Sequence, residues 1–186
     1  MKWHFPGDDS ERRKWQNPEN ILPSIGLKSG STFIDVGCGE GFFTIPAAKI
    51  VGKSGVVYGL DVDEEAIETL EEKAKREELD NLVLVVGDAE RTILCELCAD
   101  IVFFANVLHD FNDPLKVLRN SKRMLKQNGL LVDLDWKKKS SEFGPPLNIR
   151  FNETQAKELI EKAGFRIEAI REAGPFHYVV TAKRRS

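Results

Sequence analysis

The sequence has little cysteine, no long apolar run and nothing that resembles a secretory leader. Only 3 of its 186 residues are cysteine, which excludes the disulfide framework of a small secreted domain. No stretch of about 18 apolar residues is present to span a bilayer, and residues 1–6 lack the apolar segment of a signal peptide. We therefore expect a cytoplasmic protein without a membrane span, whose thiols stay reduced.

The balance of charge argues against nucleic acid as a partner of the surface as a whole. The chain has 27 Lys and Arg against 30 Asp and Glu, a net charge of -3, so it offers no overall attraction to a phosphate backbone. Two short basic runs, residues 137–139 and 183–185, are exceptions. Each is expected to be solvated surface, with a local docking patch as the alternative.

Cys95 and Cys98 have the C-x-x-C spacing found in zinc sites and redox motifs. A structural zinc site needs about four ligands. No second pair of cysteines or histidines in the sequence has matching spacing. We therefore expect no metal, and we place both cysteines on one face of a short helix at about residues 93–97.

Strand-like apolar runs alternate with amphipathic helical segments along most of the chain. The composition, 41% hydrophobic and 31% charged, is that of an ordinary folded domain. The alternation predicts a single α/β domain over residues 1–186, with helices on both faces of a parallel sheet. Strands are expected at residues 32–36, 55–60, 82–86, 100–105 and 130–134. Helices are expected at residues 43–51, 63–78, 93–97, 114–126 and about 153–163.

The pattern changes after the fifth predicted strand. Residues 137–150 hold three lysines, two serines, a glycine and two prolines, which predicts a long loop. Loops of this length in a compact domain are usually functional. Residues 165–170 and 176–182 then predict a closing hairpin.

Three alternate glycines, Gly37, Gly39 and Gly41, follow the first predicted strand. Glycine lets the backbone adopt positive φ and approach a ligand closely, and open α/β folds bind ligands at such strand ends. The dinucleotide pattern G-x-G-x-x-G would need glycine where the chain has Phe42. Asp35, two residues before the turn, would repel a diphosphate and attract an ammonium group. The combination favours a ligand with an amino acid end over a nicotinamide dinucleotide.

Two further carboxylates follow the next two strands. Asp61 lies 20 residues after Gly41, where an acid reaches ribose hydroxyls in nucleoside-binding folds. Asp88 can accept a hydrogen bond from an adenine amino group. Either residue alone could be only a helix N-cap. Together with Asp35, however, they match three parts of one molecule.

These segments carry a resemblance to a known family. Residues 33–41, 59–62 and 87–89 resemble the first three motifs of the class I, Rossmann-like methyltransferases, which bind S-adenosylmethionine. The resemblance implies a three-layer Rossmann-like sandwich around a mostly parallel seven-stranded sheet, with an antiparallel strand in the C-terminal hairpin.

The resemblance also implies how the cofactor is held. Residues of the first motif and Asn106 would lie at its methionine end, Asp61 at the ribose, and Val62, Asp88 and Ala89 at the adenine. The implied cofactor-binding residues are Asp35, Gly37, Cys38, Gly39, Gly41, Asp61, Val62, Asp88, Ala89 and Asn106.

Residues 106–111 are similar to those of the small-molecule methyltransferases related to ubiquinone and menaquinone C-methylation. The Asn/Asp-Pro-Pro-aromatic motif of adenine amino methyltransferases is absent. We therefore expect a small-molecule acceptor, which the sequence leaves unidentified. His109 and Asp110 are the candidate catalytic residues, with His109 as a base or substrate contact; the alternative is a surface histidine. Trp136 and Arg150 are candidate acceptor contacts, although Trp136 could equally be core.

Two segments could cover the acceptor. They are the loop of residues 137–150 and the N-terminal segment of residues 1–30, whose aromatic residues could form a lid or pack against the sheet: Trp3, His4, Phe5 and Trp15. Three alternatives to small-molecule methylation stay open. They are a protein or RNA methyltransferase, a nicotinamide oxidoreductase, and a cofactor-binding protein without catalysis.

Overall fold

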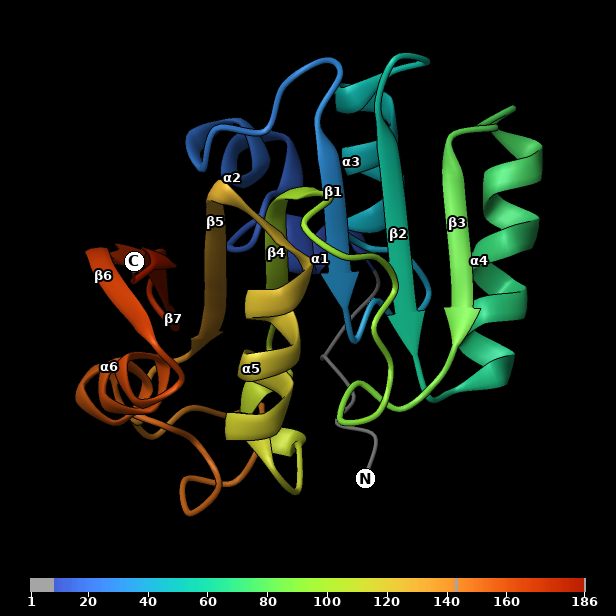
Figure 1. The fold of residues 1–186 in the computed structure, drawn as a ribbon. Coiled ribbons are helices and arrows are strands. Elements are labelled where there is room, and N and C mark those ends of the chain that lie inside the picture. The colour runs from blue at the N-terminus through green and yellow to red at the C-terminus, as the bar shows by residue number, and fades with distance from the viewer. Residues whose placement is uncertain (1–8, 143, 186) are drawn as a thin grey trace.

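A seven-stranded sheet forms the centre of the computed structural model, which describes residues 9–142 and 144–185 (Figure 1). The strand order is β3-β2-β1-β4-β5-β7-β6; β7 runs antiparallel to both of its neighbours, and the other neighbouring strands are parallel. The strands are β1 (Thr32–Val36), β2 (Val56–Asp61), β3 (Leu82–Val86), β4 (Ala99–Ala105), β5 (Leu125–Trp136), β6 (Phe165–Ala173) and β7 (His177–Arg184). The helices are α1 (Asp9–Arg13), α2 (Pro18–Ser24), α3 (Thr44–Val51), α4 (Glu64–Arg76), the 3-10 turn η1 (Leu108–Asp110), α5 (Pro114–Met124) and α6 (Glu153–Lys162).

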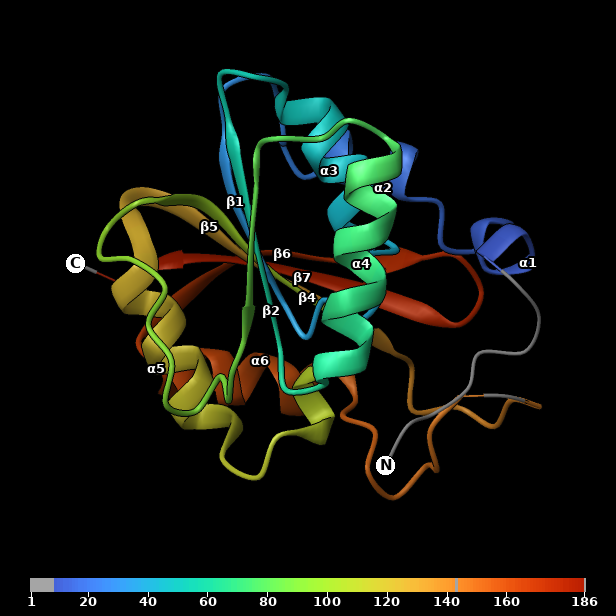
Figure 2. The same ribbon diagram turned by 90° about the vertical axis from the view of Figure 1, so that its right-hand side faces the viewer.

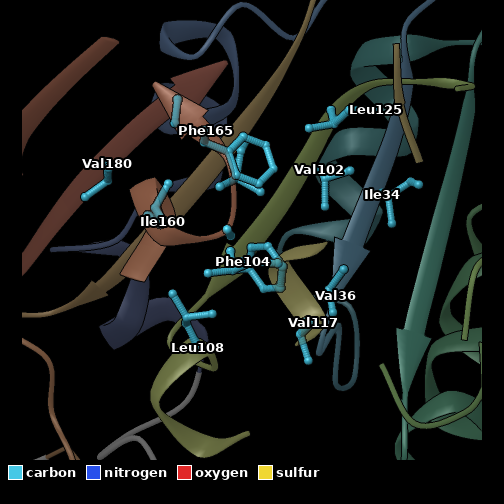
Figure 3. Packing of buried hydrophobic residues seen from close by; sticks show 14 of the residues in the cluster. Ile34, Val36, Val102, Phe104, Leu108, Val117, Leu125, Ile160, Phe165 and Val180 are labelled. Carbon is cyan, nitrogen blue, oxygen red and sulfur yellow. The ribbon is translucent and has the colours of Figure 1, made fainter. Parts of the chain in front are cut away.

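Helices cover both faces of the sheet (Figure 2). On one face, α2, α3 and α4 bury side chains such as Leu22 and Ala47 against Phe33 and Phe103. On the other face, α5 and α6 bury side chains against the opposite sides of the same strands, as Figure 3 shows for Val117, Ile160, Ile34 and Val102. The three-layer sandwich with a mostly parallel sheet, predicted from the sequence, is therefore confirmed.

Local sequence explains why these elements form. The central strand β4 is apolar and buried from residue 101 to 104, because both of its sides face helices. Helix α4 buries Ile67, Leu70 and Ala74 at helical spacing and begins at Asp63, whose side chain accepts from the Ala66 amide. Helix α6 begins with the reciprocal capping box of Asn152 and Gln155.

The predicted short helix at residues 93–97 is wrong. No helix forms between β3 and β4; Ile93 and Leu94 instead pack against the core from an irregular connection. Cys95 and Cys98 form a disulfide in that connection, so the expectation of two thiols on a helix face is wrong too. The fifth strand also begins five residues earlier than predicted, at Leu125 rather than Leu130. Within residues 9–142 and 144–185, no helix has the length and apolar character needed to cross a membrane.

Candidate active site

A cavity of about 520 Å³ lies at the carboxyl ends of β1, β2 and β4. This is the edge of an open α/β sheet where ligands bind. The lining residues come from α1, the end of β1 and the turn after it, the end of β2, helix α4 with its N-cap, and the end of β4 with the residues after it: Asp9, Arg12, Asp35, Gly37, Cys38, Gly39, Glu40, Phe42, Phe43, Asp61, Asp63, Ala66, Lys73, Ala105, Asn106 and Val107. Six of the ten predicted cofactor-binding residues are among them.

The turn after β1 requires glycine at its two ends. Gly37 has φ +74°, and a Cβ there would lie 2.6 Å from Cγ2 of Val107. Gly41 has φ +89°, and a Cβ there would lie 2.3 Å from Cδ1 of Leu70. At Gly39, between them, a Cβ would meet nothing within 4 Å, because this part of the turn faces the open cavity. Side chains therefore pack closely against the turn at Gly37 and Gly41, and the backbone at Gly39 faces the cavity.

Asp61 is held at the cavity wall by backbone amides. The amide of Gly39 donates to its Oδ2 (2.7 Å) and the amide of Asp63 donates to its Oδ1 (3.0 Å). The N-cap of α4 is Asp63 rather than Asp61. The alternative that Asp61 is only a helix cap is therefore wrong.

Asp35 is a buried carboxylate at the floor of the cavity. The Thr44 hydroxyl donates to its Oδ2 (2.7 Å). Burial raises the pKa of Asp35 to about 7; the Thr44 hydrogen bond lowers it, the charge of Asp61 raises it and the guanidinium of Arg12 lowers it. A cationic ligand group beside Asp35 would favour its ionised form.

Helix α1 supplies side chains that the sequence did not single out. The guanidinium of Arg12 lies 3.8 Å from the centre of the Phe42 ring, and its Nε donates to Oε1 of Gln16 (2.8 Å). Burial lowers the pKa of Arg12 to about 9, opposed by the charges of Asp9 and Asp35. No local motif marks Arg12, because it reaches the cavity only through the packing of the N-terminal segment.

Asn106 follows β4 in the left-handed region, with φ +59°. Its backbone amide donates to the Leu134 carbonyl (2.7 Å), and its side-chain amide donates to Oε1 of Gln16 (3.1 Å). Asn106 thus ties the end of β4 both to β5 and to the N-terminal segment. Positive φ is uncommon for a residue other than glycine and often marks a functional turn.

The predicted adenine-binding residues lie outside the cavity lining. Val62 is 70% exposed. The Asp88 carboxylate accepts from the Glu90 amide (2.8 Å) and pairs with Arg91 (3.5 Å), and Ala89 is buried. Val62 follows β2, and Asp88 and Ala89 follow β3.

His109 is buried, so the alternative of a surface histidine is wrong. Its Nδ1 lies 2.8 and 2.9 Å from the two carboxylate oxygens of Asp135, at the end of β5. Burial lowers the pKa of His109, but the hydrogen bond and charge of Asp135, with the charge of Asp110, outweigh it, so the net shift is upward. The Nε2 atom lies 3.6 Å from Oδ1 of Asp110. The sequence marked His109 and Asp110 but not the link to Asp135.

Trp136 and Arg150, the predicted acceptor contacts, are both buried. Trp136 lies against Trp15 (5.8 Å between ring centres) and His177 (4.1 Å), so Trp15 packs on the sheet. Trp3, His4 and Phe5 fall outside the described residues. Arg150 lies over Trp136 and donates within its own loop, to the carbonyls of residues 137, 139 and 145 and to the Ser141 hydroxyl.

The basic run at residues 137–139 is only partly a surface feature. The Lys137 ammonium is buried and donates to Glu172 (2.9 Å) and to the Gly174 carbonyl (3.3 Å). Lys138 and Lys139 are exposed.

Comparison with known proteins places this geometry in a family. The model of the methyltransferase domain matches residues 27–168. Demethylmenaquinone methyltransferase of Geobacillus sp. (strain WCH70) is 32% identical over 122 residues, which are 66% of this chain and 51% of that protein. The corresponding enzyme of Staphylococcus carnosus (strain TM300) is 34% identical over 125 residues, 67% of this chain and 50% of that protein. The chain thus spans about half the length of the curated relatives that it matches.

A solved structure matches over nearly the whole chain. A SAM dependent methyltransferase from Aquifex aeolicus superposes with a TM-score of 0.88 at 33% identity, covering 95% of this chain and 98% of that one. The arsenic (III) S-adenosylmethionine methyltransferase of Chlamydomonas reinhardtii, with a TM-score of 0.65 at 20% identity over 87% of this chain and 65% of that one, shares the fold. With the cavity at the ends of β1, β2 and β4 and the domain match over residues 27–168, the chain belongs to the methyltransferase domain family.

Proposed function

We propose that this protein transfers a methyl group from S-adenosylmethionine to a small-molecule acceptor. The observation that carries the proposal is the pair of carboxylates, Asp35 and Asp61, on either side of a glycine turn that faces a 520 Å³ cavity. A cavity of that size is in the range that small-molecule ligands occupy. The family membership agrees with this chemistry, and the activity of the whole protein is our inference.

The residues present fit the cofactor. An ammonium group pairs with the buried Asp35 carboxylate, which has one hydroxyl donor from Thr44 and a cation, Arg12, nearby. The Asp61 carboxylate, fixed by two backbone amides, keeps acceptor capacity for two ribose hydroxyls. The open side of Gly39 lets the ligand approach the backbone, with Gly37, Cys38 and Gly41 completing the turn.

We assign the adenine to the β2 and β3 strand ends. Val62 presents an exposed apolar side chain there, and burying it under a planar ring would remove apolar surface from water. Asp88 follows the neighbouring strand β3; its Oδ1 accepts from the Glu90 amide, and its Oδ2 would exchange the 3.5 Å contact with Arg91 for the adenine amino group. The buried Ala89 and the backbone at Asn106 complete the proposed cofactor site.

His109 and Asp110 are the proposed catalytic residues. Transfer from a sulfonium is an in-line displacement in which the donor already carries a good leaving group, so orientation supplies much of the rate. His109 adds a proton acceptor. We assign the acceptor side to Trp136 and Arg150, which lie against the loop of residues 137–150. The proposed lid of the single domain, residues 1–30, is described by the structure from residue 9 onward.

Calorimetry tests the cofactor assignment. We expect S-adenosylhomocysteine to bind in the micromolar range and NAD to bind far more weakly. Asp61→Ala should weaken S-adenosylhomocysteine at least tenfold, because it leaves the ribose hydroxyls without charge-assisted bonds of about 1.5–3 kcal/mol. The reverse preference, for NAD, would overturn the proposal.

Asp100→Asn is the matched control. Asp100 also accepts a backbone amide, from Thr32 (2.8 Å), but lies at the start of β4, at the opposite end of the sheet. Asp100→Asn should lower the free energy of unfolding and leave the affinity for S-adenosylhomocysteine unchanged. Equal loss of affinity in both variants would mean that Asp61 acts only through the fold.

A further inference from the structure

Two of the 3 cysteines lie together in the connection between β3 and β4, residues 87–98. Cys95 and Cys98 form a disulfide there, and both are partly buried against the core. The two residues between them, Glu96 and Leu97, are exposed. The disulfide therefore closes a turn at the surface, and exposed disulfides are the ones that thiols in solution reduce most readily.

The third cysteine lacks the properties that make a thiol reactive. Cys38 is buried, and burial, together with the charges of Asp35 and Asp61, raises the pKa of its thiol. Only the thiolate takes part in thiol–disulfide exchange, so Cys38 does not compete for either sulfur of the pair. Exchange at residues 95 and 98 is therefore confined to those two cysteines.

The turn that the disulfide closes has an uncommon backbone conformation. Leu97 has φ +51°, in the left-handed region that residues with a side chain seldom adopt and that surrounding structure must enforce. The Leu97 amide donates to the Arg123 carbonyl (3.0 Å), and the Cys98 amide donates to the Met124 carbonyl (2.9 Å). The disulfide adds a covalent constraint to these two hydrogen bonds. Reduction removes that constraint.

The same connection includes two of the proposed adenine contacts, Asp88 and Ala89. It runs beside α5 (Figure 2), which holds it by side chains. The Asn120 side-chain amide donates to the Ala89 carbonyl (2.8 Å), and the Leu94 amide donates to Sδ of Met124 (3.4 Å). Because the connection forms no helix, its position depends on such separate contacts and on the disulfide that closes its far end.

We propose that Cys95 and Cys98 are a reversible thiol–disulfide site, which exchanges with low-molecular-weight thiols and disulfides of the glutathione class. We further assign the tighter binding of S-adenosylmethionine to the disulfide form. The effect on the cofactor rests on the proposed function, whereas the exchange chemistry does not.

The exchange is balanced by the small molecule. The thiolate of one cysteine attacks a sulfur of glutathione disulfide, and a mixed disulfide forms as one glutathione thiolate leaves. The second cysteine thiolate then displaces the second glutathione. Two electrons pass from the protein to glutathione disulfide, and the two protons of the cysteine thiols are taken up by the two glutathione thiolates. Reduction by two glutathione molecules is the same sequence in reverse.

The entropy of the closed ring limits how strongly the two sites are coupled. Closing the ring of residues 95–98 removes chain entropy equivalent to about 20-fold in an equilibrium constant. Only part of this reaches Asp88 and Ala89, because Asn120 and Met124 hold the connection in either form. We therefore expect reduction to weaken the binding of S-adenosylhomocysteine by about 3- to 10-fold.

The first experiment titrates the pair without any cofactor. The protein is equilibrated with mixtures of glutathione and glutathione disulfide, its thiols are trapped with a maleimide, and the added groups are counted by mass spectrometry. We expect the pair to pass from dithiol to disulfide across these mixtures, with Cys38 reacting only after unfolding. A pair that stays a disulfide at every ratio, or stays a dithiol at every ratio, would overturn the proposal.

The second experiment measures the coupling. In the absence of ligand, hydrogen exchange over residues 87–98 should be faster in protein reduced with dithiothreitol than in the disulfide form. Calorimetry should show the 3- to 10-fold loss of affinity for S-adenosylhomocysteine on reduction. The double variant Cys95→Ser, Cys98→Ser is the matched control. It should bind as the reduced wild type does and should not respond to dithiothreitol.

The outcomes separate this inference from the proposed function. If S-adenosylhomocysteine binds neither redox form, the proposed function is overturned, and the titration and hydrogen exchange still decide the redox site. Equal affinity of the two wild-type forms, or a double variant that responds to dithiothreitol as the wild type does, contradicts the assigned coupling. If the double variant does not fold, reduced wild type alkylated with iodoacetamide takes its place as the form that cannot close the disulfide.

Discussion

The carboxylates at the ends of β1 and β2 face a cavity, whereas Asp133 on β5 and His177 on β7 are enclosed by protein. Asp35 and Asp61 accept hydrogen bonds from residues within about one βα unit, Thr44, Gly39 and Asp63. Asp133 is buried with neither oxygen bonded among the described residues. His177 is stacked on Trp15 and lies against the tilted ring of Trp136, and burial lowers its pKa to about 3. The first region is arranged for a ligand and the second for packing, with His109 between them.

The sharpest test of this difference compares two glycines of one turn. Gly37→Ala would bring a methyl group to 2.6 Å from Val107 at positive φ, and we expect a loss of about 2–5 kcal/mol in the free energy of unfolding. Gly39→Ala has positive φ but open space, so it should cost about 1–2 kcal/mol and weaken cofactor binding instead. Chemical denaturation measures the loss of stability in both variants, and calorimetry measures their affinity for S-adenosylhomocysteine. Equal destabilisation would show that the open side of Gly39 is not a ligand surface.

Arg150 tests the packed region. Arg150→Ala removes the donors to three loop carbonyls and to Ser141, and we expect residues 137–150 to lose at least about 2 kcal/mol of protection in hydrogen exchange. Arg166→Ala is the control, because its exposed guanidinium is paired with Glu168 and should contribute little. Exchange in the loop that is already fast in the wild type would instead make residues 137–150 a mobile cover.

The pH dependence of cofactor binding tests Asp35. Its folded-state pKa of about 7 lies above the ordinary value of 3.8. The free energy of unfolding of the free protein therefore declines as the pH rises from 3.8 toward 7 and Asp35 ionises. A bound ammonium group would favour the ionised carboxylate and offset this loss of stability. Affinity for S-adenosylhomocysteine should therefore fall as the pH drops below 7, by up to about tenfold per pH unit. Calorimetry from pH 6 to 8 measures this. If the affinity of Asp35→Asn depended on pH in the same way, the group that titrates on binding would be one other than Asp35.

The substitution of Asp133 has the smallest expected effect on stability, and unlike the glycine and arginine substitutions it should stabilise the protein. Burial, followed by the charge of Asp135, raises the pKa of Asp133 well above 3.8, so its contribution to stability declines as the pH rises above 3.8 toward the folded-state value. The free energy of unfolding of Asp133→Asn should match that of the wild type near pH 4 and exceed it by about 1 kcal/mol at pH 8. Melting temperatures at the two pH values check this. A less stable variant at pH 8 would mean that Asp133 has a buried partner as an anion.

The sequence predicted best where structure depends on neighbours along the chain. The strands, the glycine turn and the positions of helices α5 and α6 follow from local pattern. The contacts it missed join distant segments: His109 to Asp135 across 26 residues, and Asn106 to Gln16 across 90. The helix expected at residues 93–97 failed because a short apolar run has no period strong enough to separate a helix from a buried connection.

Strand β7 gives the sheet a particular order of assembly. Its residues 177–184 lie between β5 and β6, so β6 has β7 as its only strand neighbour in the sheet described over residues 9–142 and 144–185. During synthesis on the ribosome, β5 and β6 therefore lack the strand that pairs with both of them until residues 177–184 have emerged. Exposed strand edges are sites of aggregation, so a chaperone that acts on this nascent chain has its greatest effect in that interval.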